Sequence, residues 1–183
     1  MTRALIVIDM QRAFDDLDFW GATTNPDCER NVAALIDAWA AADEPIVLVR
    51  HDSTSPHSPL HPDNAGNELV DAVAAASPAL FVTKNVNSAF YGDPDLQAWL
   101  GTQNISELVV CGIQTNMCVE TTARMAGNLG YDVTLPIDAT HTFDVEGPGG
   151  IRLSAAELAR ATAVNLHGGG FARVVTTDDV LAR

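Results

Sequence analysis

Six short, almost uninterrupted runs of apolar residues alternate with segments whose apolar residues recur at helical spacing. The runs cover residues 4–8, 46–49, 80–83, 108–111, 132–135 and 172–175. Strands this apolar are buried on both faces, which happens when helices cover both sides of a parallel sheet. The alternation therefore predicts an α/β fold of three layers. In it, a six-stranded parallel sheet lies between helices that connect the strands by right-handed crossovers.

The helical segments are expected at residues 27–41, 67–76, 94–100, 117–129 and 154–167. In the first of them, Val32, Leu35, Ile36 and Trp39 fall on one helical face. A length of 183 residues suits a single domain, residues 1–183, with a sizeable core. Two longer loops are predicted, at residues 51–67 and 144–150, where binding residues are often found.

The charge of the chain restricts its partners. It has 10 basic and 24 acidic side chains, a formal net charge of −14, which disfavours nucleic acid and anionic membranes as partners. No apolar segment approaches the ~20 residues that a membrane span needs, and the first strand is too short to be a secretory signal. The three cysteines are odd in number and lack metal-ligand spacing, which favours free thiols in a reducing compartment. We therefore expect a cytoplasmic protein.

Glycine motifs for nucleotides are missing where they would be needed. The first strand is followed by Asp9-Met-Gln-Arg, with no G-x-G-x-x-G turn to approach a pyrophosphate. The run of glycines at 168–170 precedes the last strand, as expected for a helix end, and no G-x-x-x-x-G-K-[ST] motif occurs. Nucleotide binding is disfavoured.

Three side chains that could carry chemistry lie at the ends of predicted elements. Asp9 and Lys84 each follow a strand, and Cys118 lies where a Gly-containing turn leads into a helix. Open α/β sheets build their sites at such strand ends, and a helix N-terminus favours the nucleophilic thiolate. Plainer roles exist for each residue alone: Asp9 as a cap, Lys84 as a solvated side chain and Cys118 as a small buried one.

Three motifs in order resemble the isochorismatase-like cysteine hydrolases. They are Ile-Val-Ile-Asp9-Met-Gln-Arg-Ala-Phe14, Lys84-Asn-Val-Asn-Ser88-Ala-Phe90 and Gly112-Ile-Gln-Thr-Asn-Met-Cys118-Val119, and the resemblance spans nearly the whole chain. It implies a Rossmann-like fold and a catalytic triad at Asp9, Lys84 and Cys118. It also implies a cis peptide between Ile113 and Gln114, with the N–H groups of Gln114 and Cys118 forming an oxyanion hole.

A reaction can be assigned to these residue types. A thiolate at Cys118 attacks an amide or related carbonyl, and it needs a base that accepts the thiol proton and later delivers it to the leaving nitrogen. No histidine is adjacent to Cys118 in the sequence, so Asp9 is the candidate. Lys84 would hold the Asp9 carboxylate in place and favour the thiolate.

Residues near the triad are candidates for substrate contact. Asn87, Ser88 and Tyr91 lie close to Lys84 in the sequence, whereas Phe14 and Trp20 follow the first strand. The aromatic residues could wall a small pocket, or they could serve in packing or in a subunit contact. The family resemblance implies a homo-oligomer that acts on a small molecule.

The loop after the second strand raises the question of a metal. His51, Asp52, His57 and His61 are chemically sufficient for zinc or iron. Nicotinamidases of the resembled family place an Asp-x-His motif there, whereas this chain has Thr54 at the position of that histidine. The loop therefore resembles that of metal-free members, and we predict neither a metal nor another cofactor.

The presence of a thiol distinguishes between two reactions of the resembled family. Isochorismatases cleave a vinyl ether without needing a thiol, whereas amidohydrolases use cysteine as the nucleophile. We therefore predict hydrolysis of a C–N bond in a small amide, carbamoyl or ureido compound through a thioester of Cys118. Vinyl-ether cleavage is an alternative, as is a non-catalytic binding or scaffold protein on the same fold.

Overall fold

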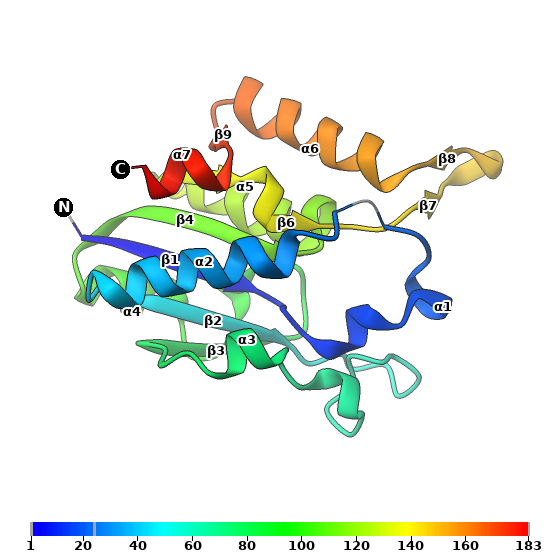
Figure 1. Ribbon diagram of the computed structural model, residues 1–183, viewed down its shortest axis with the longest axis horizontal. Coiled ribbons are helices and arrows are strands. Elements are labelled where there is room, and N and C mark those ends of the chain that lie inside the picture. The colour runs from blue at the N-terminus through cyan, green and yellow to red at the C-terminus, as the bar shows by residue number, and fades with distance from the viewer. Residues whose placement is uncertain (1, 24, 183) are drawn as a thin grey trace.

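The computed structural model describes residues 2–23 and 25–182 (Figure 1). Its main sheet is parallel throughout and has the order β3-β2-β1-β4-β5-β9, with the short β6 paired to β4. The strands are β1 Thr2–Ile8, β2 Ile46–His51, β3 Leu80–Lys84, β4 Ile105–Ile113, β5 Asp132–Pro136, β6 Thr140–His141 and β9 Arg173–Val175. All six predicted strands are present, so the predicted three-layer α/β fold is confirmed, and β6 is an addition to it.

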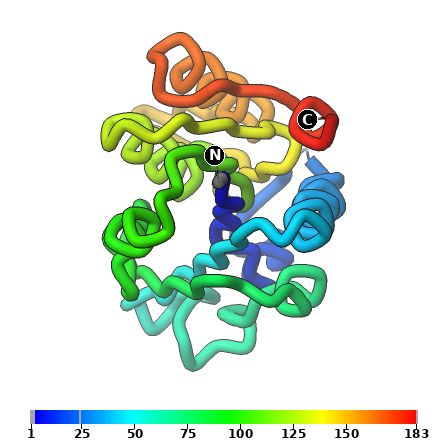
Figure 2. Tube along the Cα trace, turned by 90° about the vertical axis from the view of Figure 1, so that its left-hand side faces the viewer, coloured from blue at the N-terminus to red at the C-terminus, as the bar shows by residue number. Residues whose placement is uncertain are grey.

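Helices cover both faces of this sheet. The longer ones are α2 Cys28–Ala41, α4 Leu96–Thr102, α5 Glu120–Asn128 and α6 Ala155–Gly168, and the short ones are α1 Leu17–Trp20, α3 Asp71–Ala74 and α7 Thr177–Leu181. The end-on view of Figure 2 shows α2, α3 and α7 on one side of the sheet and α4 and α5 on the other. Alternate residues of β1 pack against the two helical layers. Leu5 and Val7 pack on the α2 side of the sheet, and Ile6 and Ile8 pack on the α5 side.

The prediction of a helix at residues 67–76 is mostly wrong. Only a 3-10 turn, Ala65–Asn67, and the single turn of α3 form there. Between them the chain is extended because it pairs with the segment after β1: the Arg12 N–H donates to the Glu68 carbonyl, and the Val70 N–H to the Met10 carbonyl. These tertiary hydrogen bonds replace the i→i−4 bonds that a helix would need.

Residues 144–150, predicted as a loop, instead begin a hairpin. Strands β7 Val145–Glu146 and β8 Arg152–Leu153 pair antiparallel, and Arg152 forms a 2.8 Å ion pair with Glu146. Figure 1 shows this hairpin projecting beyond the body of the protein, at the end of the sheet where α1 also lies. It therefore flanks the carboxyl ends of the parallel strands.

Strands β1 and β4 approach each other closely at their carboxyl ends. Gly112 pairs with Ile8 and has a φ of +115°, and a Cβ at this position would overlap the Ile8 carbonyl oxygen. Only glycine tolerates both conditions. The strand order also reverses direction between β1 and β4, which is the place where open α/β sheets bind ligands.

A membrane span is not found in the described residues, since none of their helices combines the length and the apolar character that crossing a bilayer requires.

Candidate active site

The sheet brings the three predicted catalytic side chains to one edge. Lys84 is the last residue of β3 and pairs with His51 on β2, while Asp9 follows β1 and Cys118 follows β4. Asp9 has a left-handed backbone conformation, with φ of +49°, a region that aspartate tolerates better than most residues. The chain turns there, and the Asp9 carboxylate lies beside Lys84.

The Lys84 ammonium is the centre of the cluster. Its Nζ lies 2.6 Å from Asp9 Oδ2, 3.3 Å from Cys118 Sγ and 3.1 Å from His51 Nδ1. The Lys84 and Asp9 side chains are fully buried, at 0% and 1% exposure. An ammonium has three N–H donors, and here each faces an acceptor. Lys84 is therefore held as a fixed cation that touches both the carboxylate and the thiol.

The second oxygen of Asp9 is free. Oδ1 is buried and has no hydrogen-bond partner among the described residues. Burial raises the pKa of the Asp9 carboxyl above its usual value, although Lys84 offsets part of this effect. A carboxylate with a raised pKa and a free oxygen is suited to accept a proton.

Cys118 lies in a π-helical turn, Thr115–Val119, that continues into α5. Besides the contact with Lys84, its thiol donates to Asn87 Oδ1 at 3.9 Å. Burial and then the Asp9 carboxylate raise the pKa of the Cys118 thiol to about 12, and Lys84 only partly offsets them. The prediction that the helix N-terminus stabilises a resting thiolate is therefore wrong. A thiolate beside ionised Asp9 would place two negative charges next to one ammonium.

These opposed groups predict an unusual pH dependence of thiol reactivity. Between the pKa values of Asp9 and Cys118 the pair holds one proton, and internal transfer from the thiol to Asp9 does not depend on pH. We expect the rate of iodoacetamide alkylation at Cys118, followed by peptide mass spectrometry, to be nearly constant from about pH 6 to 9. In Asp9→Asn the proton must leave for solvent, so the rate should rise about tenfold per pH unit. A tenfold rise per unit in the wild-type protein would contradict this coupling.

A cavity of about 390 Å³ opens onto these groups. One wall is aromatic: ring centroids of Phe14 and Trp20 lie 4.9 Å apart, and those of Trp20 and Phe143 lie 5.7 Å apart. The full lining consists of Asp9, Phe14, Trp20, His51, Ser58, Leu60, Asn87, Gln114, Met117, Cys118, Phe143, Asp144 and Val145. A small molecule with an apolar or flat part fits such a surface.

Three of the five suggested substrate contacts, Phe14, Trp20 and Asn87, line this cavity, and two do not. The Ser88 hydroxyl is buried, accepts a hydrogen bond from the Phe90 N–H and donates to Met125 Sδ. Tyr91 is 72% exposed. The 3-10 turn Ala89–Tyr91 begins directly after Ser88, so both residues belong to the turn region that follows the cavity residue Asn87.

The expected oxyanion region follows β4. The peptide bond between Ile113 and Gln114 is cis, and Gln114 lines the cavity beside Cys118. Within the described residues, no hydrogen bond uses the backbone N–H of Gln114. This donor is thus available to a ligand.

The loop residues considered for a metal are dispersed. The Asp52 carboxylate accepts hydrogen bonds from Arg50 and Asn67, His57 is exposed, and His61 contacts Asp63. One set of possible ligands does converge within the described ranges, namely Asp9, His51 and Cys118, whose ligand atoms lie within 4.8 Å of one another. Lys84 Nζ touches all three side chains, so an ammonium occupies the place where a bound cation would be.

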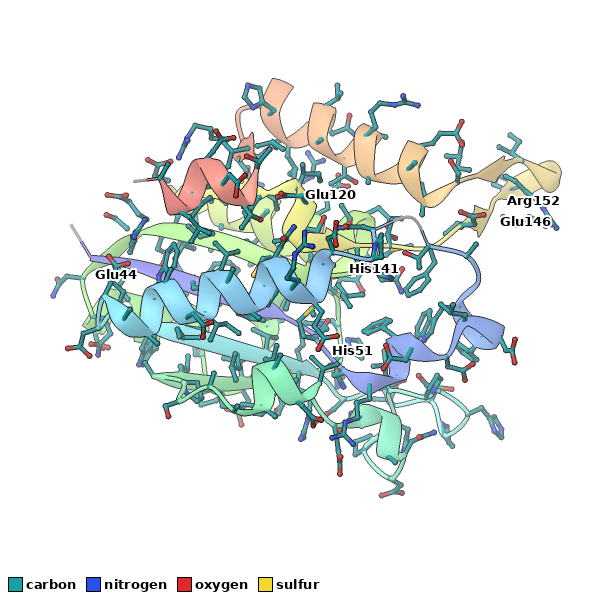
Figure 3. All side chains as sticks on the ribbon, viewed as in Figure 1. Glu44, His51, Glu120, His141, Glu146 and Arg152 are labelled. Carbon is teal, nitrogen blue, oxygen red and sulfur yellow. The ribbon has the colours of Figure 1, made fainter. Side chains whose placement is uncertain are left out.

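Several residues of the site are not predicted individually from the sequence, and two of them, Phe143 and His51, matter most for its shape and chemistry. Phe143 completes the aromatic wall from a segment far along the chain, and no local pattern marks it. His51 (labelled in Figure 3) was considered only as a metal ligand, yet its ring contacts Lys84 at the end of β2. Its place at the end of a strand adjacent to β3 was a usable signal.

Comparisons with known proteins agree with this architecture. The isochorismatase domain family model matches residues 3–179. The chain is 35% identical to the isochorismatase family protein YrdC of Bacillus subtilis, over 98% of this chain and 94% of the relative. It is 34% identical to Nicotinamidase 3 of Arabidopsis thaliana, over 96% and 85%. A crystal structure of an isochorismatase-family protein from Chromobacterium violaceum matches with a TM-score of 0.92 and 38% identity, over 99% and 92% of the two chains.

The family model, the relatives matched over most of their length and the fold thus all indicate the same family. The chain belongs to the isochorismatase family and is a hydrolase.

Proposed function

We propose that this hydrolase cleaves the C–N bond of a small amide, carbamoyl or ureido compound through a thioester of Cys118. One observation carries the proposal: a buried ammonium contacts a carboxylate and a thiol simultaneously, at 2.6 Å and 3.3 Å, on the wall of a cavity of about 390 Å³. A nucleophile, a proton acceptor and a fixed counter-charge are the groups that acyl transfer to sulfur requires.

The first half-reaction begins with proton transfer from the Cys118 thiol to Asp9 Oδ1. The sulfur attacks the amide carbon, and the oxyanion that forms accepts hydrogen bonds from the N–H groups of Gln114 and Cys118. Asp9 then gives its proton to the leaving nitrogen. The C–N bond breaks, ammonia or an amine departs, and the acyl group remains on Cys118 as a thioester.

The second half-reaction uses the same groups with water. Asp9, ionised again, takes a proton from water as the oxygen attacks the thioester carbon. Collapse of the second tetrahedral intermediate releases the carboxylic acid product, and the thiolate recovers its proton from Asp9. The Lys84 ammonium takes no part in these proton transfers and balances whichever of Asp9 and Cys118 carries the negative charge.

The charge of the cavity favours this reaction over vinyl-ether cleavage of isochorismate. That substrate carries two carboxylates, which proteins usually bind with arginine or lysine. Among the described residues, the cavity lining contains neither, and it includes the carboxylates of Asp9 and Asp144. Lys84, behind the lining, is already paired with Asp9. A non-catalytic binding or scaffold protein on this fold would not need a carboxylate, an ammonium and a thiol in contact, so the cluster of Asp9, Lys84 and Cys118 favours an enzyme over that alternative.

A substrate panel tests the proposal by ammonia release. Nicotinamide, benzamide, isobutyramide and phenylurea probe uncharged compounds, N-carbamoylglycine is an anionic control, and isochorismate is assayed separately for vinyl-ether cleavage. We expect turnover of at least one uncharged compound, and slower turnover of N-carbamoylglycine because of its carboxylate. Cleavage of isochorismate alone, with no C–N hydrolysis, would contradict the proposal.

A further inference from the structure

The imidazole of His51 is held in one protonation state by its neighbours. Its Nδ1 lies 3.1 Å from the Lys84 ammonium, which can only donate hydrogen bonds. Nδ1 must therefore accept, and the ring proton resides on Nε2. Burial and then the Lys84 charge lower the pKa of His51 to about 4, so the ring stays neutral near pH 7.

Two buried amides fix the backbone of the same residue. The His51 carbonyl accepts hydrogen bonds from Gln11 Nε2 and Asn67 Nδ2, both at 3.0 Å, and the His51 N–H donates to Gln11 Oε1 at 2.9 Å. Gln11 and Asn67 are only 1% and 4% exposed. Backbone and ring are thus both immobilised, an arrangement typical of groups that must present an atom in one direction.

The other ring nitrogen is unpaired and not fully buried. Nε2 has no partner among the described residues, and it is also absent from the polar atoms that are buried without a partner. His51 lines the same cavity as Cys118, Gln114 and the aromatic wall. The accessible, unpaired Nε2–H is therefore a donor that a molecule in this cavity can reach.

We propose that His51 is a substrate-binding residue whose Nε2–H donates a hydrogen bond to an acceptor atom of the substrate. This inference rests on the proposed function, because it takes the substrate to occupy the cavity beside Cys118. The oxyanion is assigned to the backbone donors, so the acceptor for His51 is a second one. The substrate class narrows to uncharged C–N compounds that carry a further carbonyl, ring nitrogen or ether oxygen.

Nitrogen-15 NMR of histidine-labelled protein tests the donor without any substrate. We expect the His51 signals of a neutral ring protonated on Nε2 from about pH 6 to 8, because an ammonium faces Nδ1. In Lys84→Met this preference for one tautomer should be lost. A ring protonated on Nδ1, or a charged ring at pH 7, would overturn the inference.

Two variants separate the two nitrogens of His51. The amide of His51→Asn reaches the position of Nδ1 and keeps an acceptor for Lys84, whereas the amide of His51→Gln extends to the position of Nε2 and keeps a donor in the cavity. With nicotinamide, the uncharged compound of the panel whose ring nitrogen offers the second acceptor, we expect His51→Asn to lower kcat/KM by about 10- to 100-fold, mainly through KM, as loss of one substrate hydrogen bond predicts. His51→Gln should keep KM close to that of the wild-type protein, because its amide can still donate to the substrate.

Alkylation of Cys118 by iodoacetamide is the control, since His51→Asn should leave its rate within about threefold of wild type. Equal kcat/KM losses in both variants, with slower alkylation in both, would show a positioning role and overturn the substrate contact, as would an unchanged KM in His51→Asn. If the wild-type protein hydrolyses no compound of the panel, the proposed function fails, while the NMR result still decides whether the donor exists.

Discussion

Cys118→Ala is expected to lower kcat/KM for the fastest C–N substrate by at least about 10³-fold, because the variant has no atom that can form the acyl bond. The change removes one sulfur from a partly buried position, so the fold should remain, which thermal unfolding can check. Ammonia release under single-turnover conditions measures the effect.

Cys28→Ala is the matched control for Cys118→Ala. Cys28 is also a free cysteine, but it is buried, packs on the α2 side of the sheet and lies outside the cavity that contains Cys118. Its loss should leave turnover within about twofold of wild type, since no proposed step uses it. Turnover in Cys118→Ala comparable to that in Cys28→Ala would exclude the thioester route.

Lys84→Met is expected to lower the free energy of unfolding by about 3–5 kcal/mol at pH 8, because it leaves Asp9 buried without its counter-ion. Asp9 is fully buried and its 2.6 Å bond to Lys84 would be lost. Turnover should fall as well, since the thiol loses the same ammonium at 3.3 Å. Chemical denaturation at several pH values measures this change in the free energy of unfolding.

The pH dependence of that loss has a definite sign. Without Lys84, burial raises the pKa of Asp9 in the folded state above its value of about 3.9 in the unfolded chain. The folded variant then binds this proton more tightly, so its stability falls as pH rises from the unfolded to the folded pKa. The deficit should be larger at pH 8 than at pH 5. Adding Asp9→Asn should restore most of the stability and remove this dependence, whereas a Lys84→Met protein within about 1 kcal/mol of wild type at pH 8 would contradict a buried ion pair.

Much of the fold could be predicted because its signals are local. A strand buried on both faces has to be apolar along its length, so β1 and the five other main strands are visible in the sequence. The short elements are not, because tertiary contacts decide them: residues 68–70 pair with the segment after β1 rather than continuing a helix. The β7–β8 hairpin is likewise too short for any periodicity to mark it.

The site likewise has a part that can be predicted from the sequence and a part that cannot. Parallel strands place their carboxyl ends at one edge, so Asp9 and Lys84 could be brought together from strand positions alone. The direction in which the pKa of Cys118 shifts could not be predicted, because it depends on how deeply the thiol is buried and on the nearby Asp9 carboxylate. Phe143 and the ring orientation of His51 depend on contacts between segments distant in sequence, which a single sequence does not reveal.

The thioester of Cys118 is tested most directly by acid quenching of a single turnover, with enzyme in excess over the fastest compound of the panel, and peptide mass spectrometry. We predict that the peptide containing Cys118 transiently gains the mass of the acyl group, that hydroxylamine removes it, and that the peptides of Cys28 and Cys111 stay unmodified. Product formation with an unmodified Cys118 peptide at every quench time would contradict the account.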